Sequence, residues 1–286
     1  MTEIFIGVVS HASSRFLGNT GPQGLARRLA RRLSGPTTQV AVLVNTENAW
    51  SPEILEITDE LVAESHAAQR EVEARWQRYL GGHAIRQLRK TVELFARRAR
   101  RTDPQVGRRG IERLLNIELS HRALLQAGVA SGADWILILE DDGGSTDPEE
   151  CALGLAALLE AAGAQGVAYI NLSESFTPRQ LGIDHLLTEI PSVPWVGGVQ
   201  RQVLAAERPV TNTVCAIAYR ARFARMLCAR LDSSPLSPVV AIDWKLNELL
   251  MAMHSDGVLG AGDCWLVEPA PIAQLSMHAD RQSPAS

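Results

Sequence analysis

The chain predicts an α/β fold in which a mixed sheet is flanked by helices. Three short apolar runs, at residues 4–9, 40–44 and 135–139, have the length and continuity of parallel-type strands that are buried on both faces. A helical stretch at residues 24–33 lies between the first two runs and ends at a Ser-Gly-Pro break. Strand, helix and strand at this spacing form a βαβ unit, for which we expect a right-handed crossover.

The first half of the chain continues this alternation. An alanine- and leucine-rich helix is expected at residues 149–162, and a fourth apolar run follows it at residues 167–172. Residues 1–172 therefore predict a Rossmann-like, nucleotide-binding half. Residues 173–286 would be the other half of one continuous domain, because 286 residues suit one large α/β domain or two fused halves.

An extra helical segment is expected within the first half, at residues 52–130. Breaks are predicted at residues 81–82 and 103–104, with a further weak point at residues 107–110. Residues 75–113 hold 12 Arg or Lys against 3 Asp or Glu, in a chain whose formal net charge is -4. This arginine-rich stretch is either a solvated helical face or a contact surface for an anionic acceptor, a phospholipid surface or another subunit.

The second half begins less regularly. Prolines and glycines at residues 173–212 predict a mobile loop or an irregular hairpin. Within it, Trp195 is either a flap that closes over a ligand or an anchor for the loop. The elements expected afterwards are a strand at residues 214–219, an amphipathic helix at 222–231, a helix from Asp243 and an extended stretch at 264–275.

Composition excludes several classes of protein. The chain is 46% hydrophobic and 21% charged, which is typical of a globular protein and not of a disordered or nucleic-acid-binding one. No apolar run reaches the ~18 residues of a membrane span, and the N-terminus has no signal-peptide pattern, so we expect a soluble, cytoplasmic protein. The four cysteines form no CxxC pair and match no zinc spacing, which favours reduced, mostly buried thiols.

An acidic triplet directly follows the apolar run at residues 135–139: Glu140, Asp141 and Asp142. In open α/β sheets, ligands bind beyond the carboxyl ends of the strands. Three crowded carboxylates repel one another, so a hard divalent cation such as Mn²⁺ or Mg²⁺ would offset them and still bind phosphate oxygens. The alternative is an acidic surface turn before the helix start at Asp147. The spacing and closing glutamate of an EF-hand calcium loop are absent.

Three motifs follow one another in an order known from one family. Leu-Ser-His at residues 119–121 leads into Leu-Glu-Asp-Asp at residues 139–142. Thr-Asn-Thr-Val-Cys-Ala at residues 211–216 precedes a helix, and Ala-Ile-Asp-Trp-Lys-Leu stands at residues 241–246. Over roughly residues 110–275, this order and spacing resemble the GT-A fold glycosyltransferases, in particular the lipooligosaccharide galactosyltransferase family (glycosyltransferase family 25).

The resemblance implies a metal-dependent glycosyltransferase that moves a sugar from a nucleotide-sugar donor, usually a UDP-sugar, to a hydroxyl acceptor. The first half would bind the donor and the second half the acceptor. Asp142 would be the main metal ligand, with Glu140 or Asp141 reaching the metal or the ribose. The other residues implied around the nucleotide and its diphosphate are Ser10, His11, Arg15, Asn45, Glu47 and His121.

Two further residues complete the predicted site. Asp243 lies ahead of a helix in the acceptor half, where a carboxylate can take the proton from an acceptor hydroxyl in one inverting displacement. It is also a favoured helix N-cap residue, and the two roles are compatible. His278 is either a loose C-terminal histidine or a metal ligand, as a late histidine is in several GT-A enzymes.

Two other functions share part of this pattern. A sugar nucleotidyltransferase has the same βαβ half and metal, but it begins with a glycine-rich phosphate loop, which residues 10–18 are not. A catalytically inactive GT-A-like binding or scaffold protein would keep the core and tolerate loss of Asp243. The expected partners are a nucleotide-sugar donor and a sugar, lipid-linked or natural-product acceptor, without nucleic acid. Peripheral membrane contact through residues 75–113 and a homodimer stay open.

Overall fold

The structure, a computed structural model, describes residues 2–11, 14–81, 104–174, 177–193, 195–211 and 213–276. The strands of the main sheet are β1 Thr2–Val9, β2 Thr38–Asn45, β3 Trp135–Glu140, β5 Tyr169–Asn171, β7 Leu187–Glu189, β8 Gln202–Ala206, β9 Ala216–Arg220 and β10 Cys264–Glu268. They form one eight-stranded sheet in the order β2-β1-β3-β9-β5-β10-β8-β7.

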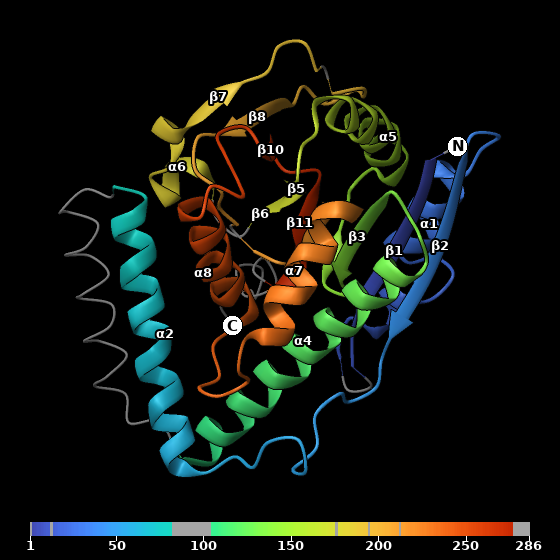
Figure 1. Ribbon diagram of the computed structural model, residues 1–286. Coiled ribbons are helices and arrows are strands. Elements are labelled where there is room, and N and C mark those ends of the chain that lie inside the picture. The colour runs from blue at the N-terminus through green and yellow to red at the C-terminus, as the bar shows by residue number, and fades with distance from the viewer. Residues whose placement is uncertain are drawn as a thin grey trace, which may run out of the picture.

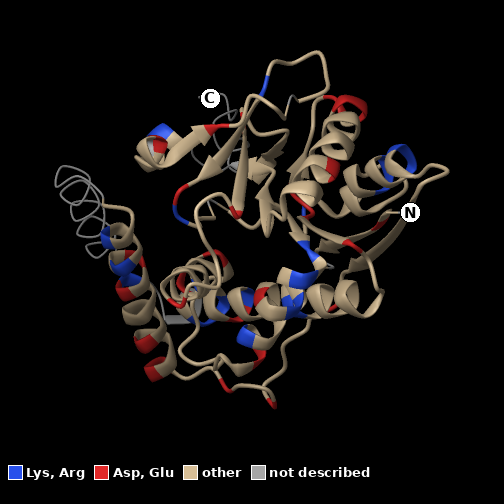
Figure 2. Ribbon diagram, turned by 45° about the horizontal axis from the view of Figure 1, so that its top comes forward, with Lys and Arg blue, Asp and Glu red and all other residues tan. Residues whose placement is uncertain are grey.

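The described helices lie on both faces of this sheet (Figure 1), and their bounds are α1 Leu25–Leu33, α2 Asp59–Tyr79, α4 Pro104–Ala130, α5 Pro148–Gln165, α6 Pro178–Leu181, α7 Ala221–Ser233 and α8 Ile242–Ser255. Charged residues lie mainly on these helices and on the loops (Figure 2). The predicted α/β class is therefore confirmed. Within the described ranges, no helix combines the length and apolar character needed to cross a membrane.

The first three strands are parallel. β1 pairs in parallel with β2 on one side and with β3 on the other, and α1 connects β1 to β2. The predicted βαβ unit is thus present. β9 lies antiparallel between β3 and β5, so strands from both halves of the chain alternate in one sheet. β10 is parallel to β5, and β8 and β7 complete the edge as antiparallel strands.

Alternate side chains of β3 face opposite helical layers. Ile136 and Ile138 belong to the core under α4 and α7, whereas Trp135 and Leu137 belong to the core under α1 and α5. Side chains on a strand alternate between its two faces. Glu140, the last residue of β3, is therefore directed to the α4 side of the sheet.

Two glycines let α4 approach the sheet closely. A Cβ atom on Gly128 of α4 would lie 2.7 Å from Ile136 Cγ2, and one on Gly7 of β1 would lie 2.9 Å from Ile138 Cδ1 and 3.1 Å from Leu124 Cβ of α4. Real Cβ atoms do not come this near to other heavy atoms, so both positions need glycine for this packing. The close approach fixes the side chains of α4 relative to the end of β3.

Helix α5 begins immediately beyond the acidic triplet. The Asp147 side chain accepts hydrogen bonds from the backbone N–H groups of Glu149 and Glu150, both at 3.0 Å, and Pro148 occupies the first turn. Gly166 ends the helix with a φ of 74°, which favours glycine. The expected start near Asp147 is confirmed.

The extra helical segment differs from the prediction at two points, the first being that its first helix begins at Asp59 and not at residue 52. α2 ends at Tyr79 and α4 begins at Pro104, as the breaks predict, and residues 82–103 lie outside the described residues. The weak point at residues 107–110 is wrong, because α4 continues through it. Packing of α4 on α2, through a cluster that includes Ile111, outweighs the small helix penalty of glycine.

Much of the basic stretch 75–113 lies among the residues that the structure does not describe. In the described part, Arg75 Nη2 lies 2.5 Å from Glu248 Oε1, and Arg108 Nε lies 2.9 Å from Asp59 Oδ1. These two arginines therefore lie in ion pairs with the acidic residues of neighbouring helices.

The apolar run of strand β2 predicts burial on both faces, but the structure shows that this prediction is wrong. It is the edge strand of the sheet, its residues alternate between partly buried and exposed, and the Leu43 side chain is 45% exposed. At residues 173–212 the hairpin interpretation is confirmed, since β7 and β8 pair in antiparallel fashion. Residues 190–193 and 195–201 form neither helix nor strand, as the loop interpretation predicts, whereas α6 and a 3-10 turn at Asp184–Leu186 precede the hairpin.

The last extended stretch divides between two sheets. β10 joins the main sheet, whereas β11 Ile272–Gln274 lies between β4 Gly143–Gly144 and β6 Ser173–Glu174 in a small three-stranded sheet. β11 pairs antiparallel with β4, directly beyond the acidic triplet. The C-terminal segment of the described chain is thereby placed over the carboxyl end of β3.

Candidate functional site

Three potential ligand atoms meet at the end of β3. Atoms of Glu140, Asp142 and Cys215 all lie within 4.8 Å of one another. β3 and β9 are antiparallel neighbours, and the Glu140 N–H donates to the carbonyl of Cys215 at 2.8 Å. The sheet therefore brings a cysteine from the second half of the chain beside the acidic triplet of the first half.

Asp142 is buried by the C-terminal segment and is only 8% exposed. The Leu275 N–H donates to its carbonyl at 2.8 Å, and Ser276 Oγ donates to its carboxylate. Burial raises the pKa of Asp142, and the negative charge of Glu140 raises it further. Hydrogen bonds from Ser276, Gln274 and Cys215 oppose this shift but do not cancel it.

His121 faces the same cluster from α4. Its Nε2 lies 3.5 Å from Glu140 Oε1, and the residue is 1% exposed. Its Nδ1 is buried and has no hydrogen-bond partner among the described residues. The structure thus brings one residue predicted for the nucleotide side, His121, against one predicted for the metal, Glu140.

Polar residues at the carboxyl ends of β1, β2 and β3 are linked to one another. Ser10 Oγ donates to the Asp141 carboxylate, and the Ser10 N–H donates to the Asn45 carbonyl at 2.9 Å. Asn45 Nδ2 donates to Ser120 Oγ at 3.2 Å, and Asn19 Nδ2 donates to the Asp141 carbonyl at 2.8 Å. Three residues predicted around the nucleotide, Ser10, Asn45 and Asp141, therefore share one edge of the sheet.

The remaining residues predicted around the nucleotide are less closely connected to the cluster. Glu47 is exposed, and its N–H donates to Asn45 Oδ1 at 3.2 Å. Arg15 is exposed and lies over the Phe16 ring, 4.9 Å from its centre, while His11 is partly buried in the loop after β1. The metal ligand predicted at His278 lies outside the described residues. The roles assigned to these residues stay predictions.

Asp243 is the second residue of α8, so the N-cap interpretation is wrong; Ala241 occupies the cap. Asp243 Oδ1 accepts from the Trp244 N–H at 2.9 Å. Burial raises the pKa of Asp243 from 3.8 to about 6, and the charge of Glu140 contributes in the same direction.

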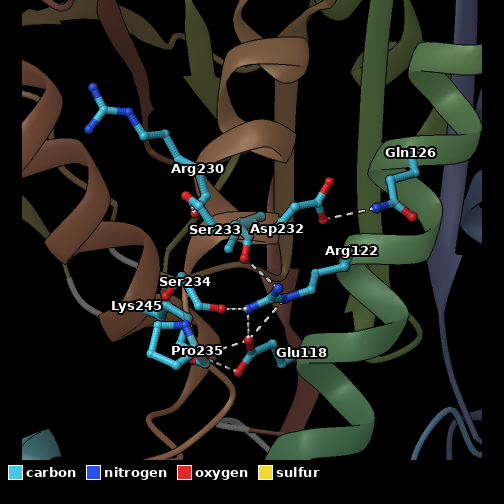
Figure 3. Close-up of polar contacts among 10 residues, drawn as sticks. Glu118, Arg122, Gln126, Arg230, Asp232, Ser233, Ser234, Pro235 and Lys245 are labelled. Atoms are coloured by element: carbon cyan, nitrogen blue, oxygen red, sulfur yellow. Dashed lines mark hydrogen bonds and ion pairs between the residues drawn. The ribbon is translucent and has the colours of Figure 1, made fainter.

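A buried ionic cluster holds α8 against α4 (Figure 3). Lys245 Nζ lies 2.7 and 2.8 Å from the two carboxylate oxygens of Glu118, which is fully buried. Arg122 Nε donates to Glu118 Oε1 at 3.0 Å, and its guanidinium also donates to two carbonyls, one in the last turn of α7 at Leu231 and one at the C-cap Ser234. Burial lowers the pKa of Lys245, and the Glu118 carboxylate opposes this shift. The cluster positions the first turn of α8, which carries Asp243.

Trp195 is anchored on α5, in the core on the face of the sheet opposite to α4. Its indole N–H donates to Glu150 Oε1 at 3.1 Å, and Arg201 lies 5.6 Å above the ring centre. A Cβ atom on Gly154 of α5 would lie 2.2 Å from Trp195 Cε2, so the ring packs directly on the α5 backbone. These contacts favour the anchoring interpretation over the flap.

A cleft of about 390 Å³ lies between α1 and the start of α5, and it is lined by Arg28, Arg31, Arg32, Pro148 and Glu149. Arg32 forms an ion pair with Glu149 across it. None of its lining residues belongs to the cluster of Glu140, Asp142 and Cys215. The cleft is therefore separate from that cluster.

Sequence reasoning missed three groups of site residues. Cys215 stands inside the motif at residues 211–216, but zinc spacing rules compare only cysteines near one another in sequence. The Glu118–Lys245 pair and the Ser276 cap on Asp142 join segments that are distant in the chain.

A comparison of the chain with known protein families finds no matching family, and a search of curated proteins finds no match either.

Proposed function

We propose that the protein is a metal-dependent glycosyltransferase of the GT-A type, which transfers a sugar from a UDP-sugar to an acceptor hydroxyl. One observation carries the proposal: ligand atoms of Glu140 and Asp142 lie within 4.8 Å of one another at the carboxyl end of the parallel strand β3. Burial raises the pKa of Asp142 and Asp243, and the charge of Glu140 adds to both shifts. We assign the acid cluster to the donor side and Asp243, in the first turn of α8, to the acceptor side of one site.

The donor atoms at this edge fit a divalent cation. Asp142 is 8% exposed and lies beside Glu140, so their combined negative charge favours a bound cation. Glu140 and Asp142 would hold it through carboxylate oxygens. When bound, it supplies positive charge that binds the diphosphate and offsets the charge of the leaving nucleotide.

The ends of β1, β2 and β3 supply the groups for the nucleotide. Ser10, Asn45 and Asp141 offer a hydroxyl, an amide and a carboxylate at one edge. A ribose has hydroxyl groups that can donate to a carboxylate such as Asp141, as acidic residues do in other nucleotide-binding sheets. Binding of the donor would exchange the Ser10–Asp141 hydrogen bond for contacts with the ribose.

Asp243 serves as the general base. The acceptor hydroxyl gives its proton to the Asp243 carboxylate while its oxygen bonds to the anomeric carbon, and the bond from that carbon to the diphosphate oxygen breaks. One such displacement inverts the anomeric configuration. A pKa of about 6 leaves the carboxylate ionised at neutral pH and basic enough to accept the proton.

Calorimetry with UDP tests the donor site. UDP is expected to bind in the presence of Mn²⁺ and to lose this binding when Mn²⁺ is omitted or when Asp142→Asn is introduced. The matched control is Asp147→Asn, because asparagine caps a helix as well as aspartate does. The proposal is overturned if UDP, GDP and CDP all fail to bind in a metal-dependent way.

Asp243→Asn tests the base. The variant is expected to bind UDP and Mn²⁺ as the wild type does and to lose sugar transfer by about a hundredfold or more. Unchanged transfer would remove Asp243 from the mechanism. Release of pyrophosphate from a nucleoside triphosphate and a sugar phosphate would instead identify a nucleotidyltransferase. Neither transfer nor donor hydrolysis with any nucleotide sugar would favour a binding or scaffold protein.

A further inference from the structure

Cys215 differs from the other cysteines in its surroundings. Cys151, Cys228 and Cys264 belong to the hydrophobic clusters that form the core, whereas Cys215 belongs to none of them, although it is fully buried. Its Sγ lies 3.6 Å from Asp142 Oδ1. A buried cysteine usually packs as a small apolar residue, whereas the Cys215 thiol faces the Asp142 carboxylate and donates a hydrogen bond to it.

The backbone holds this thiol toward the acids. The Cys215 N–H donates to the Thr213 hydroxyl oxygen at 3.2 Å, and the Cys215 carbonyl accepts from the Glu140 N–H at 2.8 Å. Both hydrogen bonds fix the residue between the end of β3 and the start of β9. The sulfur therefore lies in the cluster because of the pairing of two strands and not because of a flexible side chain.

His121 gives an independent indication of a ligand. The ring is 1% exposed, its Nε2 is aimed at Glu140 Oε1 at 3.5 Å, and its Nδ1 has no partner among the described residues. Carboxylates that bind metals are commonly held by such outer hydrogen-bonding partners. A buried imidazole directed at Glu140 thus supports a metal site, in addition to the acidic cluster itself.

We propose that Cys215 is a third protein ligand of the cation held by Glu140 and Asp142, and that its sulfur makes the site select Zn²⁺ or Co²⁺ over Mg²⁺. This inference rests on the proposed function for the presence of a cation at this edge and adds the chemical class of that cation. Sulfur is a soft ligand that suits zinc and cobalt, whereas Mg²⁺ requires oxygen ligands. The cysteine binds as a thiolate, and its proton passes to water.

Cobalt titration of the full-length protein tests the proposal directly. Co²⁺ bound to a thiolate gives a near-ultraviolet charge-transfer band, which oxygen and nitrogen ligands do not give. The wild type is expected to develop this band to saturation as Co²⁺ is added, and Zn²⁺ is expected to displace it. Mg²⁺ at the same concentration should leave the band unchanged.

Cysteine variants separate the role of the Cys215 sulfur as a ligand from general effects of losing a buried thiol. Cys215→Ser should remove the band and weaken Zn²⁺ binding by about a hundredfold, while Cys228→Ser, which changes a thiol of the apolar core, should keep both. Circular dichroism of each variant reports whether it folds, and Cys215→Ala serves if the serine is not tolerated. A wild type without the band, or a band that survives in both Cys215 variants, overturns the proposal.

The outcomes also separate this inference from the proposed function. Metal-dependent UDP binding without the cobalt band would leave the transferase proposal intact and remove Cys215 as a ligand. The band without binding of any nucleoside diphosphate would retain the metal site and reject the transferase. Absence of both would reject both.

Discussion

Lys245 Nζ lies 2.7 Å from Glu118 Oε1, and this buried contact joins α8 to α4. Glu118 stands one helical turn before His121, and Lys245 stands two residues after Asp243. This ion pair thus holds the first turn of α8, which carries Asp243, against the helix that carries His121. Breaking this ion pair would strongly destabilise the protein, because it would leave an unpaired charge buried.

Glu118→Gln is expected to destabilise the protein by about 3–5 kcal/mol, because it leaves Lys245 and Arg122 as uncompensated buried cations. Urea unfolding followed by circular dichroism measures the change. Glu248→Gln is the control, because Glu248 pairs with Arg75 in solvent, and its expected change is below about 1 kcal/mol. Equal effects of the two substitutions would contradict a structural role for the buried pair.

Asp243 should make stability depend on pH in the metal-free protein. Its folded-state pKa of about 6 is raised above the ordinary 3.8, so its stabilising contribution is fully present below about pH 4 and is lost as the pH rises through 6. The free energy of unfolding of Asp243→Asn, relative to that of the wild type, is therefore expected to rise by up to about 3 kcal/mol between pH 4 and pH 7. Urea unfolding at pH 4, 5, 6 and 7 measures this difference, and a constant difference would refute the shift.

Gly128→Ala and Gly110→Ala are expected to have opposite effects, although both lie in α4. A Cβ atom on Gly128 would lie 2.7 Å from Ile136 Cγ2, and overpacking of this kind destabilises by about 1–3 kcal/mol. A Cβ atom on Gly110 meets nothing within 4 Å, so the better helix propensity of alanine should stabilise by about 1 kcal/mol. Thermal unfolding of both variants measures these changes in stability. A Gly128→Ala variant that is more stable than the wild type would contradict the close packing of α4.

Trp195→Ala is expected to destabilise the protein by about 3–5 kcal/mol, because it empties the contact with α5 and leaves the Glu150 carboxylate without its indole donor. UDP affinity of the folded variant should stay as in the wild type. Val196→Ala, at a neighbouring side chain that is 46% exposed, should change little. Unchanged stability with weaker UDP binding would instead indicate a flap over the donor.

The regular part of the fold could be predicted because its signals are local. The apolar runs at residues 4–9 and 135–139 and the helix between residues 24 and 33 all appear in the structure as β1, β3 and α1. The place of the acidic triplet followed from the same reasoning, since Glu140 directly ends a parallel strand. In these segments, neighbouring residues alone decide the local structure.

The errors arose where packing partners decide the outcome. Residues 40–44 form an edge strand, because no further strand covers β2 within the sheet. Residues 107–110 remain helical, because α2 packs against α4. Asp243 lies inside the first turn of α8 and not at its cap, a shift of two residues that propensity alone does not resolve.

By itself, the sequence determined that a βαβ unit opens the chain, that an acidic triplet ends a buried strand, and that a carboxylate at residue 243 lies near a helix start. Only the tertiary structure decided that Cys215 and Asp142 face one another and that Glu118 pairs with Lys245. The physical reason is that strand pairing and helix packing set these distances between segments far apart in the chain. Residue spacing along the sequence carries no information about such contacts.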